Sequence, residues 1–313
     1  GNVATLNRVI LPVIRRVMPT VIANELVGVQ PMTGPVGQIH TLRVRYSDTL
    51  DDVIAGEEAL SPFKIGVGYS GGGSTDKADS TSTLEGQAGK RLSIQILKQT
   101  VEAKTRKLSA RWTFEAAQDA QAQQGIDVEA EIMAALAQEI TAEIDQEVIG
   151  SLRTLAGTAS ETFDQSAVSG TATFVGDEHA ALAVLINRVA NQIATRTRRG
   201  AGNYAVVSPT ALTVLQSATT SAFARSTEGS FEAPTNTKFV GTLNASMRVY
   251  VDAYAADGTS VLVGYKGASE ADAPAFYCPY IPLMSSGVVL DPSTFEPVVG
   301  FLTRYGYVEL TNT

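Results

Sequence analysis

The chain has 313 residues and a formal net charge of −8 at pH 7. This acidic balance does not suit a protein that clamps nucleic acid, because such a protein needs a basic face to displace counterions from phosphate. The single cysteine, Cys278, excludes an intrachain disulfide framework and a zinc site built from thiolates. No apolar run reaches the about 18 residues that indicate a transmembrane helix, so no membrane partner is expected.

The N-terminal part of the sequence predicts an arm followed by a strand. The first 25 residues are apolar, but Pro12 and Pro19 prevent one continuous helix. An apolar arm that cannot pack on itself needs another surface. The segment LVGVQPMTGPVGQIHTLRVRY at 26–46 then breaks at its prolines and glycines and continues as alternating apolar and polar residues. This alternation predicts a strand over 37–46, and a second alternating run at 90–108 predicts another.

The stretch between these two strands is dominated by Gly, Ser and Thr, which bury too little area to offset their ordering entropy. We therefore expect a long two-stranded projection with a mobile tip. Gly66–Gly71 in this stretch spells GxGxxG, a fingerprint of dinucleotide-binding loops that requires a helix directly after it. Here further glycines, Ser74 and Thr75 follow instead, so we interpret the match as a consequence of composition.

Helices are predicted after the projection at 110–124 and 127–150. The second helix carries an apolar stripe with a spacing of four residues, made of Ile132, Leu136, Ile140, Ile144 and Val148. Beside the stripe, Glu139, Glu143 and Glu147 repeat at the same spacing and repel one another. No Lys or Arg occurs from 127 to 150. Two interpretations remain open: basic residues of the arm and ribbon lie across this face, in neighbouring subunits, or the face is solvated.

A second unit is predicted to begin near Asp177, which starts a helix that runs to about Arg198 and ends before Gly200. Strand patterns and one more helix follow, with Pro209 at the favoured first helical position. The expected strands are 204–207, 247–254 and 259–265, and the expected helix is 209–216. The chain closes with the strand-like run FEPVVGFLTRYGYVEL, which must find a sheet partner.

No group of side chains in the sequence supports an active site. The paired carboxylates of 127–147 lie along a helix face without an evident cleft, and the two histidines lack the spacing of metal ligands. We therefore expect no enzyme activity, no cofactor and no metal. A nucleotide-binding enzyme that uses Gly66–Gly71 is kept as the alternative from a different functional class.

Several long segments resemble the major capsid proteins of T4-like tailed bacteriophages. They are the kinked strand at 26–46, RRGAGN at 198–203, MRVYVDAY at 247–254, GYKGASEADAPAFYCPYIPL at 264–283 and DPSTFEPVVGFLTRYGYV at 291–308. They follow the order of the family and spread over nearly the whole chain. The resemblance implies an α+β, HK97-like fold with an N-terminal arm, an extended β loop, a peripheral domain with a long spine helix, and an axial domain.

On this sequence the resemblance implies four parts. They are the arm at 1–36, the extended β loop with flanking strands at 37–108, the peripheral domain at 109–176 with 290–313, and the axial domain at 177–289. Larger members of the family carry an inserted domain near the extended loop, where this chain has only 66–89. The role of that insertion is therefore open for this chain.

The function that the resemblance implies is that of a structural subunit of the phage head. Such a subunit assembles mainly as hexamers into an icosahedral shell, in the host cytoplasm, and encloses double-stranded DNA without binding it specifically. A scaffolding protein and a prohead protease are the implied partners, with vertex, portal and decoration proteins as further candidates. Removal of a propeptide would leave Gly1 as the new N-terminus. A pentameric vertex protein or an encapsulin-like shell is the alternative within the fold.

We expect contacts between subunits at a small set of charged residues, drawn from the cationic ribbon, the acidic helix face and the family-like C-terminal segments. They are Arg43, Arg45, Glu139, Glu143, Lys266 and Arg304. For Arg304, an ion pair within its own chain is the alternative.

Overall fold

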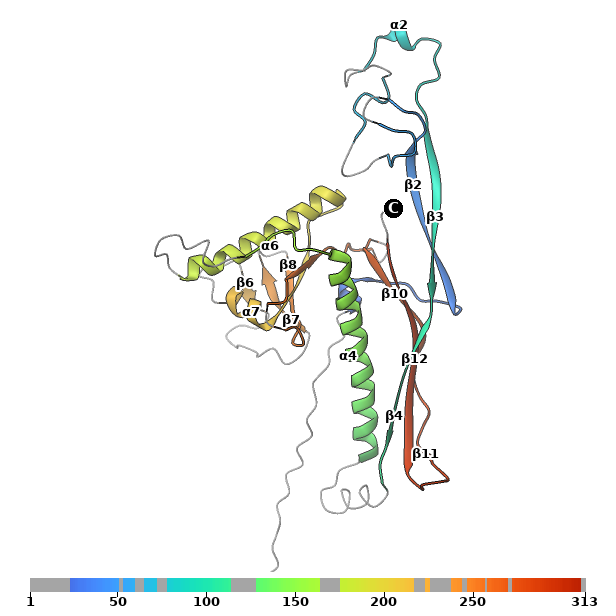
Figure 1. The fold of residues 1–313 in the computed structure, drawn as a ribbon, viewed down its shortest axis with the longest axis vertical. Coiled ribbons are helices and arrows are strands. Elements are labelled where there is room, and N and C mark those ends of the chain that lie inside the picture. Colours follow the sequence, from blue (N-terminus) through green and yellow to red (C-terminus); the bar gives the residue numbers. More distant parts are fainter. Residues whose placement is uncertain are drawn as a thin grey trace, which may run out of the picture.

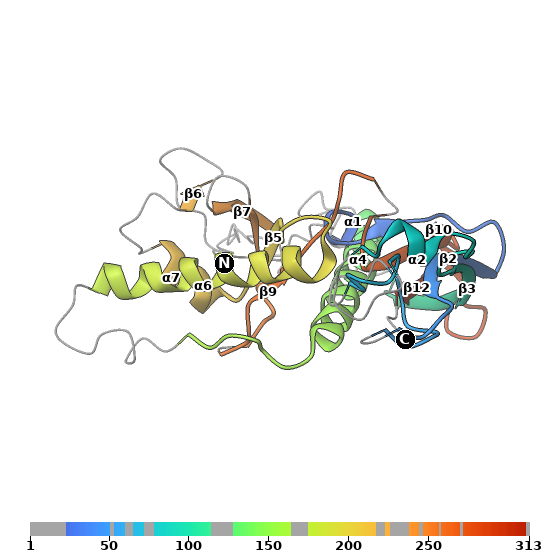
Figure 2. The same cartoon turned by 90° about the horizontal axis from the view of Figure 1, so that it is seen from above.

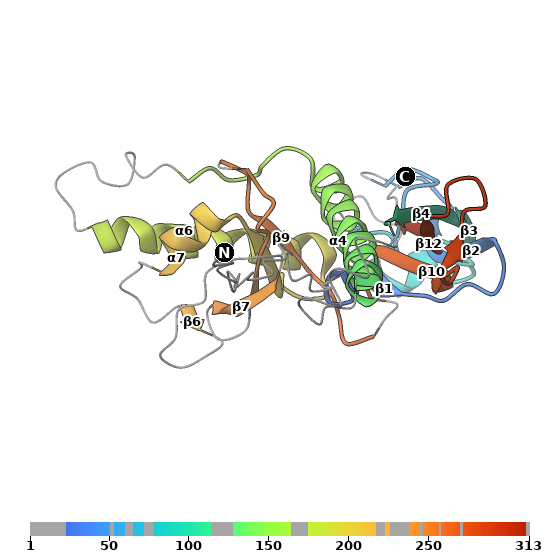
Figure 3. The same ribbon diagram turned by 90° about the horizontal axis from the view of Figure 1, so that it is seen from below.

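The computed structural model describes residues 23–50, 53–59, 65–71, 78–113, 128–163, 175–216, 223–225, 238–243, 247–256, 258–269 and 272–310. The described parts form a projecting ribbon, a lobe around the long helix α4 (Val128–Ala156) and a second lobe around helix α6 (Val175–Thr197) (Figure 1). Views along the long axis from either end show the two lobes side by side, with α4 at their junction (Figures 2 and 3). Within these described parts, no helix has both the length and the hydropathy needed to cross a membrane.

The ribbon consists of β2 (Val36–Tyr46) and β3 (Leu92–Glu102), which pair antiparallel without a register shift along their whole length. The predicted two-stranded projection is thus confirmed. Its far end holds the short helix α2 (Thr81–Leu84) and a small apolar cluster of Tyr46, Val53, Ala59 and Tyr69. This cluster is the only core the described part of the ribbon head possesses, because glycine, serine and threonine dominate the rest of its sequence.

The return strand of the ribbon passes from one sheet to another. β3 ends just before Ala103, whose backbone N–H donates to the carbonyl of Pro35. The next strand, β4 (Lys104–Arg111), leaves the ribbon and pairs with β12 (Pro297–Glu309). The sequence predicted one strand over 90–108 and a helix from 110. The helix prediction is wrong over residues 110 and 111, because these residues continue the ladder with β12; 114–124 lie outside the described residues.

The sheet of the first lobe runs in the order β1 (Gly28–Val29), β10 (Ala275–Ser285), β12 and β11 (Val289–Leu290), with β4 also paired to β12. The predicted C-terminal strand therefore finds two long antiparallel neighbours, β10 and β4. The short helix α1 (Ala23–Leu26) precedes β1. Alternate residues of β12 are buried, and two of them, Val299 and Phe301, pack in one cluster with Leu136 and Ile140 of α4.

Helix α4 connects the two lobes. Its predicted apolar stripe is confirmed, since the N-terminal half packs on the sheet while Val148, Ile149 and Leu152 pack against Tyr204 and Tyr250 of the second lobe. The helix extends past the predicted end at residue 150 to Ala156. Gly157 follows with a φ of +71°, the left-handed conformation that commonly ends a helix.

The second lobe contains a sheet in the order β6 (Phe223–Arg225), β7 (Lys238–Leu243), β8 (Met247–Val251), β5 (Tyr204–Val207) and β9 (Leu262–Gly264). Helices α6 and α7 (Pro209–Gln216) share a buried core with β5 and β8. The helix predicted for 209–216 and the strand predicted for 204–207 are confirmed. The strand predicted for 247–254 ends earlier, at Val251, because the chain turns after Asp252.

Candidate assembly surfaces

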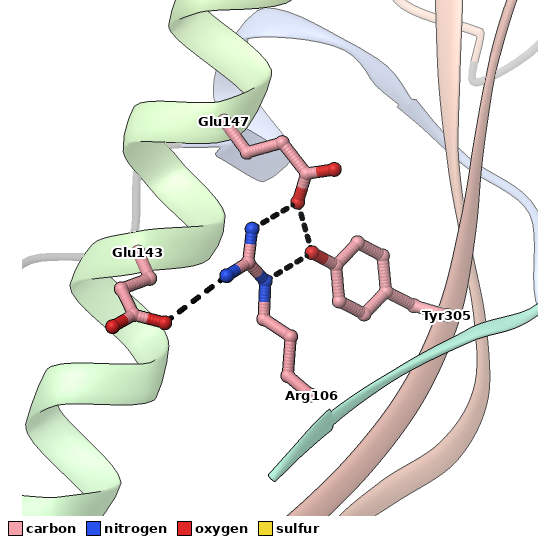
Figure 4. A network of polar contacts seen from close by, with 4 residues as sticks. All are labelled: Arg106, Glu143, Glu147 and Tyr305. Atoms are coloured by element: carbon pink, nitrogen blue, oxygen red, sulfur yellow. Dashed lines mark hydrogen bonds and ion pairs between the residues drawn. The ribbon is translucent and has the colours of Figure 1, made fainter. Parts of the chain in front are cut away.

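A polar network ties the return strand of the ribbon to helix α4 and to strand β12. The guanidinium of Arg106 on β4 donates to the carboxylates of Glu143 at 3.0 Å and Glu147 at 2.6 Å, and its Nε donates to the Tyr305 hydroxyl at 2.6 Å. The Tyr305 hydroxyl in turn donates to Glu147 (Figure 4). Arg106 lies three residues after the point where the strand changes sheets, so the network holds the root of the ribbon against the body of the subunit.

The ionisation of this network follows from its surroundings. Partial burial disfavours the charged guanidinium, but hydrogen bonds to Glu147 and Tyr305 outweigh that cost and raise the pKa of Arg106. Burial, and then the hydrogen bond to Glu147, raise the pKa of Tyr305. At neutral pH the network therefore contains a charged guanidinium and a neutral phenol, an arrangement suited to positioning elements rather than to proton transfer.

Part of the acidic face of α4 thus has a cation from its own chain. Arg106 forms ion pairs with Glu143 and Glu147, whereas Glu139 is exposed and has no ion pair within the described residues. One of the basic residues of the ribbon does lie across the acidic helix, as one interpretation of the sequence held, but it belongs to the same subunit. A role of Glu139 or Glu143 in contacts between subunits stays a prediction.

The two ribbon arginines are engaged with their own chain. Arg43 is 9% exposed, and its guanidinium lies 4.0 Å from the carboxylate of Glu58. Arg45 donates to the carbonyl of Gly56 at 3.0 Å. Both arginines hold the segment after β2 against the ribbon, and a contact of either with another subunit stays a prediction.

The two C-terminal basic residues lie in different lobes. The backbone of Lys266 exchanges hydrogen bonds with the side chain of Asn203, which fixes the loop after β9. Arg304 lies on β12 with its guanidinium 5.1 Å from the ring centre of Tyr280, a cation–π contact. The described residues show no ion pair of Arg304, so the intrachain alternative has no support among them, and its assembly role stays a prediction. Gly1 lies outside the described residues.

Exposed large apolar side chains gather in two places that the predicted set of charged residues missed. The first place is the ribbon with its head, where the exposed residues are Val36, Leu42, Ile54, Ile65, Val67, Leu92, Ile94 and Ile96. The second is the hairpin end of the first lobe, where they are Leu283, Met284, Val288, Val289, Leu290 and Phe295. The alternation of residues 92–96 signals one apolar face, but a sequence does not tell whether such a face is covered by its own chain.

The ribbon face has a regular structure. Leu42 lies directly opposite Ile96 across the ladder, and Ile94 and Leu92 follow on the same side of β3. Ile94 is 70% exposed and Leu42 65%. Apolar patches of this kind on a folded chain mark surfaces that bind other molecules.

The Gly66–Gly71 segment does not form a phosphate-binding turn. Residues 67–71 form turns, and the Gly66 N–H donates to the hydroxyl of Tyr46 instead of pointing at a free site. No helix begins within the described part of this segment. It serves the small core of the ribbon head, where Tyr46 and Tyr69 pack edge to face.

Comparison with known proteins identifies the family. The model of the major capsid protein Gp23 family matches residues 3–90 and 64–313. The major capsid protein of Vibrio phage KVP40 is 30% identical over 395 aligned residues, covering 98% of this chain and 76% of that protein. That of Enterobacteria phage T4 is 31% identical over 400 residues, covering 98% and 75%. These relatives are structural proteins, which does not favour the nucleotide-binding alternative.

The alignments also show a difference in length from the relatives. An alignment of 395 residues exceeds the 313 residues of this chain, so the KVP40 protein carries sequence that this chain lacks. The two parts of the family match, 3–90 and 64–313, overlap over residues 64–90.

Solved structures show the same fold at low sequence identity. The capsid of Myoviridae phage XM1 aligns with a TM-score of 0.55 at 12% identity, covering 99% of this chain and 95% of that chain. The capsid of cyanophage P-SCSP1u also aligns with a TM-score of 0.55, at 13% identity, covering 98% and 90%. The α+β architecture with its projecting ribbon and spine helix is thus the HK97-like capsid fold. The chain belongs to the Gp23 family of major capsid proteins, which form the head shell of tailed phages.

Proposed function

We propose that this subunit assembles mainly as hexamers into an icosahedral shell, and that the ribbon of each copy is covered by neighbouring copies. The observation that carries this proposal is the exposed apolar face formed by Leu42, Leu92, Ile94 and Ile96. A two-stranded ribbon is marginally stable in water without further packing, and its free edges favour association. Many weak contacts of this kind, repeated by symmetry, add up to a stable shell.

The charge of the subunit supports a role in a shell that encloses double-stranded DNA without binding it specifically. A formal net charge of −8 repels the phosphate backbone and disfavours tight binding to it. A scaffolding protein, a prohead protease and vertex, portal and decoration proteins are the proposed partners, and assembly takes place in the host cytoplasm. Support for these partners and this place comes from the family resemblance. A pentameric vertex protein or an encapsulin-like shell is less well supported, since the family is that of the major capsid protein.

The test replaces apolar side chains of the ribbon without changing its charge. In the double variant Ile94→Thr/Ile96→Thr, we expect a folded subunit that needs at least about tenfold higher concentration to assemble, since two apolar contacts per copy are lost. The matched control, Ile94→Val/Ile96→Val, keeps the face apolar and assembles as the unmodified chain does. Sedimentation measures assembly, circular dichroism confirms folding, and electron micrographs show whether the shell lattice consists of hexamers.

Shells of the threonine variant that form at the same concentration as those of the valine control would contradict the proposed role of the ribbon. Particles built of pentamers alone would contradict the hexameric assembly and favour a vertex protein.

A further inference from the structure

The hairpin end of the first lobe presents one aromatic side chain to solvent. Phe295, in the turn between β11 and β12, is 73% exposed, more than any other large apolar residue in the described part of the chain. Its φ is +57°, the left-handed region that bulky residues rarely adopt. A glycine would take this conformation freely, so the presence of an aromatic residue there indicates a function for the side chain.

The turn holds Phe295 in a defined position. The Phe295 N–H donates to the carbonyl of Asp291, and the Asp291 N–H donates to the carbonyl of Glu296. The Asp291 carboxylate accepts from the Ser293 N–H and hydroxyl and pairs with Arg111 of β4 at 2.9 Å. These bonds tie the turn to the sheet, so Phe295 projects from a braced turn rather than from a loose loop.

The same sheet carries a pocket of about 420 Å³ among β4, β10 and β12. Leu302 of β12 pairs with Met284 of the neighbouring strand β10 and with Lys107 of the other neighbour, β4. Residues that lie opposite one another point to the same side, so these three side chains share a face of the sheet. Gly300 lies two residues before Leu302, opposite Ser109, and its missing side chain deepens the hollow. The pocket is mainly apolar with one cation at its edge, and its volume falls in the range of about 300–1,000 Å³ that is typical of binding pockets.

We infer that Phe295 of one subunit inserts into this pocket of an adjacent subunit. The inference rests on the shell-forming function, which brings copies of the chain together, and it concerns the hairpin end rather than the ribbon. An exposed aromatic residue on a rigid turn and an apolar pocket are complementary, and aromatic residues in pockets often dominate the energy of an interface. Because the inserted turn and the pocket are different surfaces of the subunit, the contact is head-to-tail, the type of contact from which rings of subunits are built.

Charge supports the same pairing. Glu296 follows Phe295 directly, and Lys107 lines the pocket; neither side chain has an ion pair within the described residues. A subunit that seats its Phe295 in the pocket brings a carboxylate towards this lysine. Opposite charges at such a place fix the orientation of the contact and disfavour other partners.

Cross-linking between differently marked copies tests the contact. Subunits with Phe295→Cys and subunits with Ser109→Cys are mixed in equal amounts, assembled and oxidised with diamide, so that a disulfide can join the pocket of one copy only to the hairpin of another. We expect disulfide-linked dimers from the mixture and none from either variant alone; the native Cys278 is buried and serves as a silent background. Shells that form from the mixture without such dimers would overturn the inference, as would dimers from Phe295→Cys alone, which would show hairpins meeting each other.

A charge exchange gives a second test that does not depend on the cysteine variants assembling. Glu296→Lys should raise the concentration needed for assembly by about tenfold, and Glu296→Lys/Lys107→Glu should restore it. Unchanged assembly of the single variant, or no recovery in the double variant, would argue against the pairing. If the unmodified chain forms no shells, the proposed function fails, whereas shells without the cross-link refute only the hairpin contact.

Discussion

Replacing Arg106 with methionine removes the one cation of the network at the root of the ribbon while keeping a similar apolar stem. The side chains concerned are partly exposed, at 30% for Arg106, 45% for Glu143 and 39% for Glu147. Exposed ion pairs contribute about 0.2–1 kcal/mol each, and the bond to the Tyr305 hydroxyl adds about 1 kcal/mol. We therefore expect the free energy of unfolding to fall by about 1–3 kcal/mol.

Urea denaturation of the unassembled subunit, followed by circular dichroism, measures this loss. The matched control is Lys98→Met on β3, which removes an exposed cation that takes no part in the network and should change stability by less than about 0.5 kcal/mol. Glu147→Gln should cost more than Glu143→Gln, because Glu147 also accepts from Tyr305. Equal stability of the Arg106 and Lys98 variants would refute the view that the network fixes the ribbon to the body.

Two further predictions concern glycine positions and pH. In Gly264→Ala the new Cβ would lie 2.2 Å from the buried Tyr204 ring, so we expect the free energy of unfolding to fall by about 1–3 kcal/mol or more. Gly150 lies in open space on α4, so Gly150→Ala should raise the free energy of unfolding by about 0.5–1 kcal/mol; urea midpoints compare the two variants. Hydrogen bonds from Ser293, and then Arg111, lower the pKa of Asp291 below its ordinary value of 3.8. The ionised Asp291 therefore stabilises the fold above pH 3.8, and this stabilisation is lost as the pH falls through the lower pKa of the folded state. The difference in urea midpoint between the unmodified chain and Asp291→Asn should therefore shrink well below pH 3.8, and a constant difference would contradict this.

Local patterns predicted the elements of this protein well where one period dominates. Alternation over 37–46 corresponds to β2, the spacing of four in 127–150 corresponds to the buried stripe of α4, and Pro209 marks the start of α7. The helix expected from residue 110 was wrong, because pairing with β12 outweighs local preference there. The four-part division of the chain stays a prediction.

The candidate surfaces were harder to predict than the elements. The acidic repeat on α4 correctly indicated that a cation from elsewhere is needed, but many arginines and lysines could supply it. Arg106 does so because the strand changes sheets at Ala103 and then runs beside α4. The exposed apolar faces were missed because an alternating strand has the same pattern whether its own chain or another covers it.

The sequence by itself determined which faces of the elements are apolar, where the ribbon begins and which family the chain resembles. These follow from residue order, since side-chain periodicity and turn residues act over a few neighbours. Only the tertiary structure decided that Arg106 reaches Glu143 and Glu147, that Phe295 is exposed, and that β4, β10 and β12 form a pocket. Such contacts depend on the register and path of strands far apart in the chain, which local periodicity does not record.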